Sequence, residues 1–318
     1  MTIVWLCLGC RRLCLFSLVC LLFSIPALCR TFSFGAFGAN KVNDSDTRQL
    51  RVLTYNTHQC QQCRKAKEND VLQYVRDSGA DIVFLQEYEV RKDGRYLTFY
   101  EAKQFLQDIY PYSYFDFSIH NSRRQYGLAV FSRYPLLNKK TIRYESRANI
   151  SDCCDVLIGS DTVRLINNHL ESNRFTADDF ERLNANSFND SSNSLFSLLN
   201  KMRRAYSFRS EEARVVGKEI SASPYPVIVA GDMNDVPVSY TYRQISNSIR
   251  GLQDCFLQNG SFSCGNTFKI GKKPWNRVLG FRIDYIFVSS LFKVIDFRID
   301  ELDYSDHFPS IVTLRIEK

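Results

Sequence analysis

The chain has 318 residues, of which 45% are hydrophobic and 24% are charged, and a formal net charge of +7. These fractions are ordinary for a folded soluble protein, and the length allows a large single core. The chain contains no internal repeat and no long low-complexity tract, which excludes a repeat array. The positive charge permits an anionic substrate but is too small to indicate a nucleic-acid partner by itself.

Residues 1–30 are predicted to be a signal peptide or a single-pass membrane anchor that is not part of the fold. The apolar run from 13 to 28 is shorter than the ~20 residues that comfortably span a bilayer, but it is within the range of signal peptides. Arg11 and Arg12 favour an inside amino end and an exported remainder. Because Ala-Leu-Cys at 27–29 is a poor cleavage site, we rank a retained anchor ahead of secretion after cleavage. The remaining domain would then be membrane-anchored and periplasmic or extracellular.

Residues 31–49 carry glycine, asparagine and serine and are predicted to be a linker, so the folded domain is expected over residues 50–318. Export would allow disulfides, and one between Cys255 and Cys264 would close a turn-rich stretch. Cys60 and Cys63 have the spacing of half a zinc site or of a redox pair, but the chain has no second pair of this kind. Structural thiols are therefore the preferred interpretation.

Short apolar runs bounded by turn-forming residues predict an α/β domain with many strands. In chain order, the strands are expected at residues 50–56, 81–86, 112–117, 127–131, 155–158, 163–167, 227–230, 282–288, 293–300 and 310–316. Helical spacing of apolar residues predicts helices at residues 68–77, 100–109, 195–220 and 239–248. Residues 173–193, rich in asparagine and serine, are expected to form an exposed loop.

Nearly every predicted strand has a polar side chain with catalytic potential at or near one end. These residues are Asn56, Glu87, His169, Asp232 with Asn234, Asp284, and Asp306 with His307. Each has a plain structural explanation of its own, such as a turn cap, a solvated strand end or an ion pair. Strand ends converge in space in a layered sheet architecture, so the set as a whole indicates an active site.

Carboxylates, amides and histidines in one set, with no nucleophile elbow and no phosphate-binding glycine loop, suggest metal-assisted hydrolysis of a phosphate ester. The oxygen ligands Asn56, Glu87 and Asp306 suit a hard cation, Mg²⁺ or alternatively Mn²⁺. Such a cation would stabilise the negative charge that develops on the phosphate.

The other polar residues have complementary catalytic roles. His307, oriented by Asp284, would donate a hydrogen bond to a phosphate oxygen. Asp232 would position or deprotonate the attacking water. Asn234 and His169 are suited to holding phosphate oxygens.

The ordered motifs LTYNTH, IVFLQE, YGLAVFSRYP, LINNHLES, VIVAGDMND, RIDYIFVS and YSDHFP resemble the endonuclease/exonuclease/phosphatase superfamily. That family includes deoxyribonuclease I, exonuclease III-type repair nucleases, neutral sphingomyelinases and inositol polyphosphate phosphatases. The resemblance covers about residues 50–316, with all motifs in family order. It implies an α/β fold of four layers, in which two mixed β-sheets pack face to face and helices lie on the outside.

The resemblance also implies roles for individual residues. Glu87 matches the metal-binding glutamate of the family and Asn56 matches the asparagine at the end of the first strand. The family's aspartate–asparagine pair, its Asp–His dyad and the acidic residue beside that histidine match Asp232 with Asn234, Asp284 with His307, and Asp306. At position 169 the repair nucleases carry tyrosine, whereas His169 agrees with the deoxyribonuclease-like and sphingomyelinase-like branches.

These observations predict an exported, membrane-anchored, monomeric phosphodiesterase that depends on Mg²⁺, with Mn²⁺ as the alternative. Nuclease activity ranks first, and hydrolysis of phospholipids or inositol phosphates ranks second. A binding protein that kept the fold without catalysis ranks third. The segment 272–282, which mixes basic and aromatic residues, is interpreted as a contact for nucleic acid, as a contact for lipid headgroups, or as an ordinary exposed loop.

Overall fold

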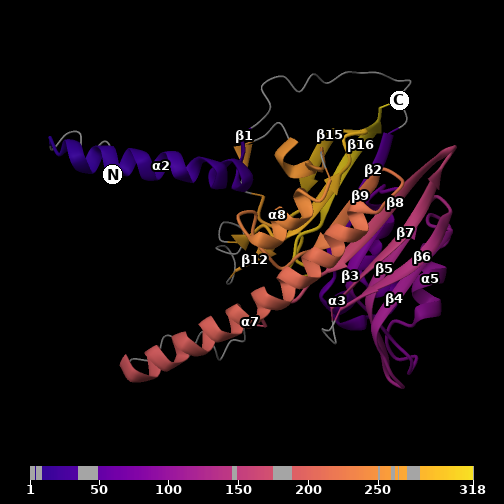
Figure 1. Ribbon diagram of the computed structural model, residues 1–318. Helices are drawn as coiled ribbons and strands as arrows, with labels where there is room; N and C mark the ends of the chain where they lie inside the picture. Colours follow the sequence, from indigo (N-terminus) through magenta and orange to yellow (C-terminus); the bar gives the residue numbers. More distant parts are fainter. Residues whose placement is uncertain are drawn as a thin grey trace.

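The computed structural model describes residues 4, 9–34, 49–144, 149–174, 188–249, 251–258, 262–263, 265–270 and 280–317. Two six-stranded mixed sheets pack face to face, with helices on the outer face of each (Figure 1). The predicted four-layer α/β sandwich is therefore confirmed.

The first sheet has the strand order β15-β16-β2-β3-β5-β4. Its strands are β2 (Gln49–Asn56), β3 (Ile82–Arg91), β4 (Tyr112–His120), β5 (Arg124–Ser132), β15 (Phe292–Ile299) and β16 (Ser310–Ile316). The central strands β2 and β3 are parallel, and all other neighbours in this sheet are antiparallel.

The second sheet has the order β10-β14-β9-β8-β7-β6 and also contains one parallel pair, β8 with β9. Its strands are β6 (Leu136–Arg143), β7 (Ile150–Ile158), β8 (Asp161–His169), β9 (Val227–Asp232), β10 (Gln253–Asp254) and β14 (Asp284–Val288). Each sheet thus has a central parallel pair, and these pairs bring β2, β3, β8 and β9 together in the middle of the sandwich, where β2 and β3 contact β9.

Three apolar layers hold the sandwich together. Between the sheets, alternate residues such as Val52, Phe84, Leu165 and Ile228 form one buried cluster. A second cluster packs the outer face of the first sheet against α3 (His58–Cys63), η1 (Ala66–Glu68), α4 (Asp70–Asp77) and α5 (Phe99–Leu106). The third packs the second sheet against α7 (Phe188–Ser221) and α8 (Tyr240–Ser246). Burial of these alternating side chains is the main stabilising contribution and sets the register of every strand.

All predicted strands and helices are present, but several bounds differ and some elements, among them α3 and β6, were not predicted. The predicted strand at 81–86 continues to Arg91, and the predicted loop at 173–193 is wrong for residues 188–193, which belong to α7. Helix propensity is a weak guide for such an asparagine- and serine-rich start. Strand β6 was not predicted, because it is an edge strand whose residues 137–140 are exposed and therefore show no alternation.

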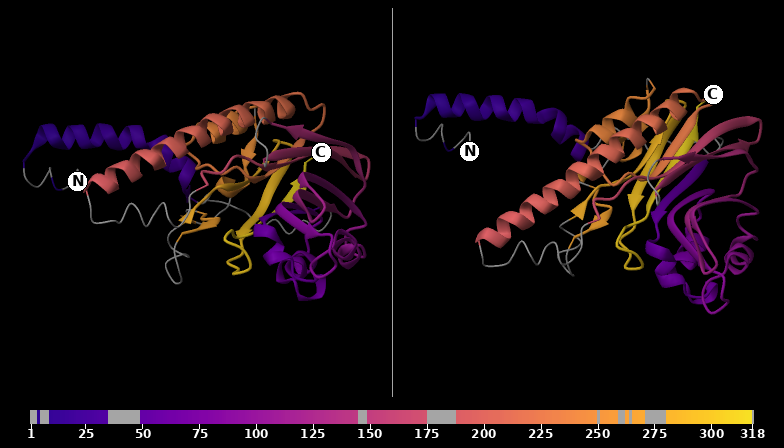
Figure 2. Two further views of the ribbon diagram at one scale, coloured as in Figure 1. Left: turned by 90° about the horizontal axis from the view of Figure 1, so that it is seen from below. Right: turned by 60° about the horizontal axis from the view of Figure 1, so that its bottom comes forward.

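The amino-terminal helix α2 (Arg11–Thr31) has no buried residue and extends away from the sandwich (Figures 1 and 2). It is long and apolar enough to cross a bilayer, a property that a signal sequence shares. Within the expected linker, β1 (Ser33–Phe34) pairs antiparallel with β11 (Phe262–Ser263), and residues 35–48 lie outside the described part of the chain.

Two short elements complete the described fold near the carboxyl end of α2. They are η2 (Cys255–Gln258) and the two-stranded sheet of β12 (Phe268–Lys269) with β13 (Gly280–Phe281). Cys153, Cys154 and Cys255 carry free thiols. Cys264 and most of the basic and aromatic segment 272–282 lie outside the described residues.

Candidate active site

Strand register brings three of the predicted residues into one row. His169 of β8 is paired with Asp232 of β9, and Asp232 is paired with Asp284 of β14. Residues paired in register on neighbouring strands point to the same face of a sheet. This face lies toward the first sheet, because Ile228 and Ile286, an even number of residues away on the same strands, belong to the cluster between the sheets.

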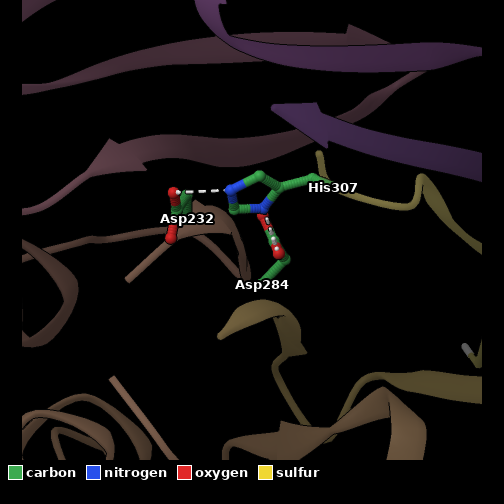
Figure 3. Close-up of side chains that lie close together, drawn as sticks. All are labelled: Asp232, Asp284 and His307. Atoms are coloured by element: carbon green, nitrogen blue, oxygen red, sulfur yellow. Dashed lines mark hydrogen bonds and ion pairs between the residues drawn. The ribbon is translucent and has the colours of Figure 1, made fainter. Parts of the chain in front are cut away.

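His307 lies between the two aspartates of this row (Figure 3). Its Nδ1 is 2.8 Å from Asp284 Oδ2, and its Nε2 is 3.8 Å from Asp232 Oδ2. Burial lowers the pKa of His307, but the carboxylates of Asp284 and Asp232 raise it by more, to about 10. The imidazole is therefore protonated at neutral pH, and its Nε2–H is directed toward Asp232.

Asp232 is surrounded by donors. Its Oδ2 accepts hydrogen bonds from Asn56 Nδ2 at 2.9 Å and from Asn234 Nδ2 at 3.2 Å. Its Oδ1 accepts a hydrogen bond from the backbone N–H of Asn234 at 2.8 Å. Burial and the nearby Asp284 raise the pKa of Asp232 to about 6, while His307 and His169 oppose this rise. The carboxylate is thus mostly ionised at neutral pH and remains basic enough to accept a proton.

The turn after β9 depends on its glycine. Gly231 has a φ of +127°, and a Cβ atom there would lie 2.1 Å from the backbone oxygen of Asn168. Asn234 has a φ of +51°, a left-handed conformation that asparagine tolerates, and it also donates to the Leu170 carbonyl at 3.0 Å. Met233, between the two polar residues, is buried in the apolar layer under α7 and α8. The turn therefore places Asp232 and the Asn234 amide in the site.

The sequence suggested that Glu87 lies at a strand end, but it lies at a bulge within β3. The register with β5 shifts between Leu85 and Tyr88, and Glu87 has a φ of +51°. A non-glycine residue in this conformation is strained, and bulges next to active sites commonly redirect a side chain. Here the carboxylate lies 3.3 Å from Asn56 Nδ2 and 3.6 Å from His169 Nε2.

Tyr126 of β5 also contacts Glu87. Burial, followed by the negative charge of Glu87 and a hydrogen bond to it, raises the pKa of Tyr126 above its ordinary value. The hydroxyl therefore keeps its proton beside the Glu87 carboxylate, whose side chain is about a fifth exposed.

Asp306 lies at the rim of the site, with 42% of its side chain exposed. Its Oδ1 is 3.4 Å from His58 Nδ1 and 3.2 Å from Ser305 Oγ. Among the described residues, no hydrogen bond or ion pair joins Asp306 to the side chain of Glu87 or Asn56. The structure therefore gathers seven of the eight predicted residues through direct contacts and places Asp306 next to them, on the turn that carries His307.

The composition of the site fits a divalent cation. In the described part of the chain, no lysine or arginine forms an ion pair with any of the four site carboxylates, Glu87, Asp232, Asp284 and Asp306. Ligand atoms of Asp232, Asp284 and His307 lie within 4.8 Å of one another, but the bond from His307 Nδ1 to Asp284 already makes these two a hydrogen-bonded dyad. The oxygen atoms of Glu87 and Asp306, which are partly exposed, and of the buried Asn56 are the hard donors that suit Mg²⁺ or Mn²⁺.

Two positioning residues were missed in the sequence. Ser305 Oγ donates to the Asn56 carbonyl at 2.8 Å and accepts from the His307 amide at 3.1 Å, so it joins the first and last motifs. Its place in a Ser-Asp-His turn was a usable signal, because serine favours such local bonds. Thr267 Oγ1 accepts from the Asp284 amide at 3.0 Å, and no local pattern indicates this contact.

The model of the endonuclease/exonuclease/phosphatase family matches residues 53–307. The chain belongs to this family. The family's members are generally phosphoester hydrolases and are typically dependent on a divalent metal. The matched region contains every residue of the site described above, so the resemblance drawn from the sequence motifs is confirmed. A search of curated proteins found no match.

Solved structures of family members share the fold. An endonuclease/exonuclease/phosphatase from Beutenbergia cavernae DSM 12333 is 19% identical, with a TM-score of 0.59 over 85% of this chain and 72% of that one. D. rerio TDP2 complexed with single strand DNA product is 18% identical, with a TM-score of 0.53 over 84% and 98% of the two chains. The human Nocturnin catalytic domain with bound sulfate is 18% identical, with a TM-score of 0.52 over 84% and 93%. At these identities, the likeness shows the fold alone.

Proposed function

We propose that this protein is a Mg²⁺-dependent phosphodiesterase that hydrolyses a phosphate ester by attack of water, with nucleic acid as the first-ranked substrate. The observation that carries the proposal is the placement of His307 between Asp284 and Asp232, beside the contact between Asn56 and Glu87. An acid, a base and a partly exposed carboxylate thus lie within a few ångströms of one another.

The two aspartates have different roles because their partners differ. Asp232 is held by two asparagine side chains and would position the attacking water and take up its proton. Asp284 is bonded to His307 Nδ1, which fixes the ring and keeps it protonated, so that Nε2–H can donate to a phosphate oxygen. His169 and Asn234 flank the same space and would hold other phosphate oxygens.

Asn56, Glu87 and Asp306 would hold the metal ion. A divalent cation bound there would offset the negative charge that develops on the phosphate during hydrolysis. Tyr126 and His169 would keep the Glu87 carboxylate oriented toward this side of the site. Mn²⁺ is expected to replace Mg²⁺, because both prefer oxygen ligands.

Nucleic acid ranks first among substrates because a fold relative, D. rerio TDP2, has been solved with a single strand DNA product. The net charge of +7 is compatible with such a polyanion. Hydrolysis of phospholipid or inositol-phosphate esters ranks second, and the apolar helix α2, which would hold the enzyme at a membrane, supports it. A non-catalytic binding protein is disfavoured because all residue types of the site are present.

We also propose that α2 is retained as a single-pass anchor and that the catalytic domain is exported and monomeric. The paired arginines before the apolar run support this orientation. Secretion after cleavage near residue 29 is the alternative. Mass spectrometry of the protein isolated from membranes would distinguish the two by the presence or absence of α2.

The proposal is tested with purified full-length protein and a panel of DNA, RNA, sphingomyelin and inositol phosphates. We expect hydrolysis of at least one substrate with Mg²⁺, loss of hydrolysis in excess chelator and recovery when Mg²⁺ is added back. Full activity in chelator would refute the metal assignment. No hydrolysis of any substrate with either metal would favour the binding protein.

A further inference from the structure

The carboxyl end of α2 is attached to the catalytic domain by specific contacts. Arg282, buried beside the site, donates through Nη2 to the carbonyl oxygen of Arg30 at 2.6 Å and through Nη1 to Asp254 at 2.6 Å. The same guanidinium lies over the ring of Phe256, 4.4 Å from its centroid. Pairing of β1 with β11, which begins three residues after Arg30, adds a second attachment. The direction of α2 relative to the sandwich is therefore set by the fold.

The amino-terminal half of α7 extends beyond the sandwich on the same side as α2 (Figures 1 and 2). This projecting part carries large apolar side chains that are open to solvent. Leu195, Phe196 and Leu199 are 50%, 67% and 49% exposed. Three large apolar residues exposed within five positions of one helix form a patch of the kind that marks an interaction site.

The charge of the projecting half is positive. Residues 188–207 contain one acidic residue, Asp190, and three basic residues, Lys201, Arg203 and Arg204. Arg203 and Arg204 are exposed and form no ion pair with the described residues. Nearer the sandwich, by contrast, Arg209 of the same helix is buried against Asp235. An apolar surface beside exposed basic residues complements an anionic lipid surface.

We propose that the amino-terminal half of α7 docks onto the anionic phospholipid surface of the bilayer that α2 crosses. Leu195, Phe196 and Leu199 would enter the boundary between headgroups and acyl chains, and Arg203 and Arg204 would face lipid phosphates. Together with α2, this second contact gives the catalytic domain one orientation on the membrane. The inference rests on the proposed anchoring by α2 but not on catalysis, so it can be tested without a substrate.

The test uses the full-length chain in phospholipid vesicles whose acyl chains are brominated, because bromine quenches tryptophan fluorescence at short range. Phe196→Trp and Leu199→Trp report on the proposed contact, and the unsubstituted protein gives the background of Trp5 and Trp275. Ser207→Trp is the matched control. It is exposed and lies on the same face as residue 196, about 16 Å closer to the sandwich along the helix axis.

We expect quenching above background to be at least about twofold greater at positions 196 and 199 than at position 207. Phosphatidylserine in the vesicles should increase the difference, and high salt should reduce it. Flotation of the full chain with the vesicles checks the anchor separately. Equal quenching at all three positions in floated protein, or cross-linking of α7 to a second copy in place of quenching, would overturn the proposal. Failure to float would overturn it together with the proposed anchor.

Discussion

Two pairs of aspartates are buried between the two sheets, and they differ in their partners. Asp232 and Asp284 share His307, and Asp232 also accepts hydrogen bonds from Asn56 and Asn234. In the other pair, Asp116 of β4 and Asp152 of β7, Asp116 accepts a hydrogen bond from the Tyr114 hydroxyl at 3.2 Å. Neither carboxyl oxygen of Asp152 has a hydrogen-bond partner.

The difference decides which carboxyl group can be charged. Burial, and then the nearby Asp116, raises the pKa of Asp152 well above its ordinary value of 3.8. The pKa of Asp232 rises only to about 6, because His307 and His169 offset its burial. Burial beside another carboxyl group thus favours the protonated, inert acid, whereas surrounding donors keep a buried carboxylate usable as a base. The candidate site is defined by these partners and not by the number of carboxyl groups.

The largest expected effect is that of Asp232→Asn on hydrolysis. The substitution keeps the size of the side chain but removes the proposed proton acceptor. Among the described residues of the His169–Asp232–Asp284 row, only Asp232 is proposed to take up the proton of the attacking water. The turnover rate should fall roughly 10³-fold, within the range for loss of a general base. Steady-state rates on the best substrate of the panel measure this, and circular dichroism checks that the fold is unchanged.

The matched control for this prediction is Asp152→Asn, which makes the same chemical change at the other buried pair. It should retain turnover near that of the unsubstituted enzyme, because Asp152 contacts none of the proposed catalytic groups. If both substitutions reduced turnover equally, the loss would reflect the packing of the sandwich and not the chemistry of Asp232.

A somewhat smaller effect is expected for His307→Gln, which removes the protonated donor between the two aspartates. The turnover rate should fall roughly 10²–10³-fold, as for the loss of a donor to a developing negative charge. Because Asp284 acts through His307, adding Asp284→Asn to His307→Gln should cause little further loss. Rates of both single variants and of the double variant test this, and multiplicative losses would show that the two residues act independently.

The sequence predicted the contents of the site better than its geometry. Residue types at strand ends were enough to find Asn56, His169, Asp232 and Asp284, because apolar strands of defined length must end near one another in a sandwich. The position of Glu87 depended on a bulge in β3, which a continuous apolar run does not reveal. The apolar run therefore predicts that the strand ends at residue 86, where β3 only bends and then continues to Arg91.

The second pair of aspartates could not have been found in the sequence. Asp116 and Asp152 are 36 positions apart and lie on strands of different sheets, so that only the packing of the two sheets brings them together. The link from Gln86 Nε2 to Asn167 Oδ1 at 2.7 Å also joins different sheets. Long-range contacts of this kind follow from the stacking of the sheets and leave no local pattern of residues.

Asp152→Asn should change the pH dependence of stability more than it changes activity. The raised pKa means that folded Asp152 keeps a proton that the unfolded chain releases above its ordinary pKa of 3.8. Below pH 3.8, Asp152 is protonated in both the folded and the unfolded chain, so it makes no pH-dependent contribution to the free energy of unfolding. As the pH rises above 3.8, the free energy of unfolding falls by up to about 1.4 kcal/mol per pH unit until the folded pKa is reached. The asparagine variant lacks this contribution.

Urea unfolding of both proteins between pH 4 and pH 8, a range chosen to begin about at the ordinary pKa of aspartate, measures the effect. The difference between their unfolding free energies should shift in favour of the variant as the pH rises. A constant difference across this range would mean that Asp152 is already ionised in the folded protein, and that the contrast between the two pairs is wrong.

The smallest expected effect is that of Asp116→Asn on the same stability profile. Asp116 is the second cause of the raised pKa of Asp152, after burial, so removing its charge should lower the Asp152 pKa without restoring the ordinary value. The pH-dependent fall in stability should then end at a lower pH, with a gain of roughly 1 kcal/mol at pH 8. The double variant with Asp152→Asn should show no further change in pH dependence, because the group that titrates is absent. If Asp116→Asn instead removed the pH dependence completely, the charge of Asp116 and not burial would be the main cause.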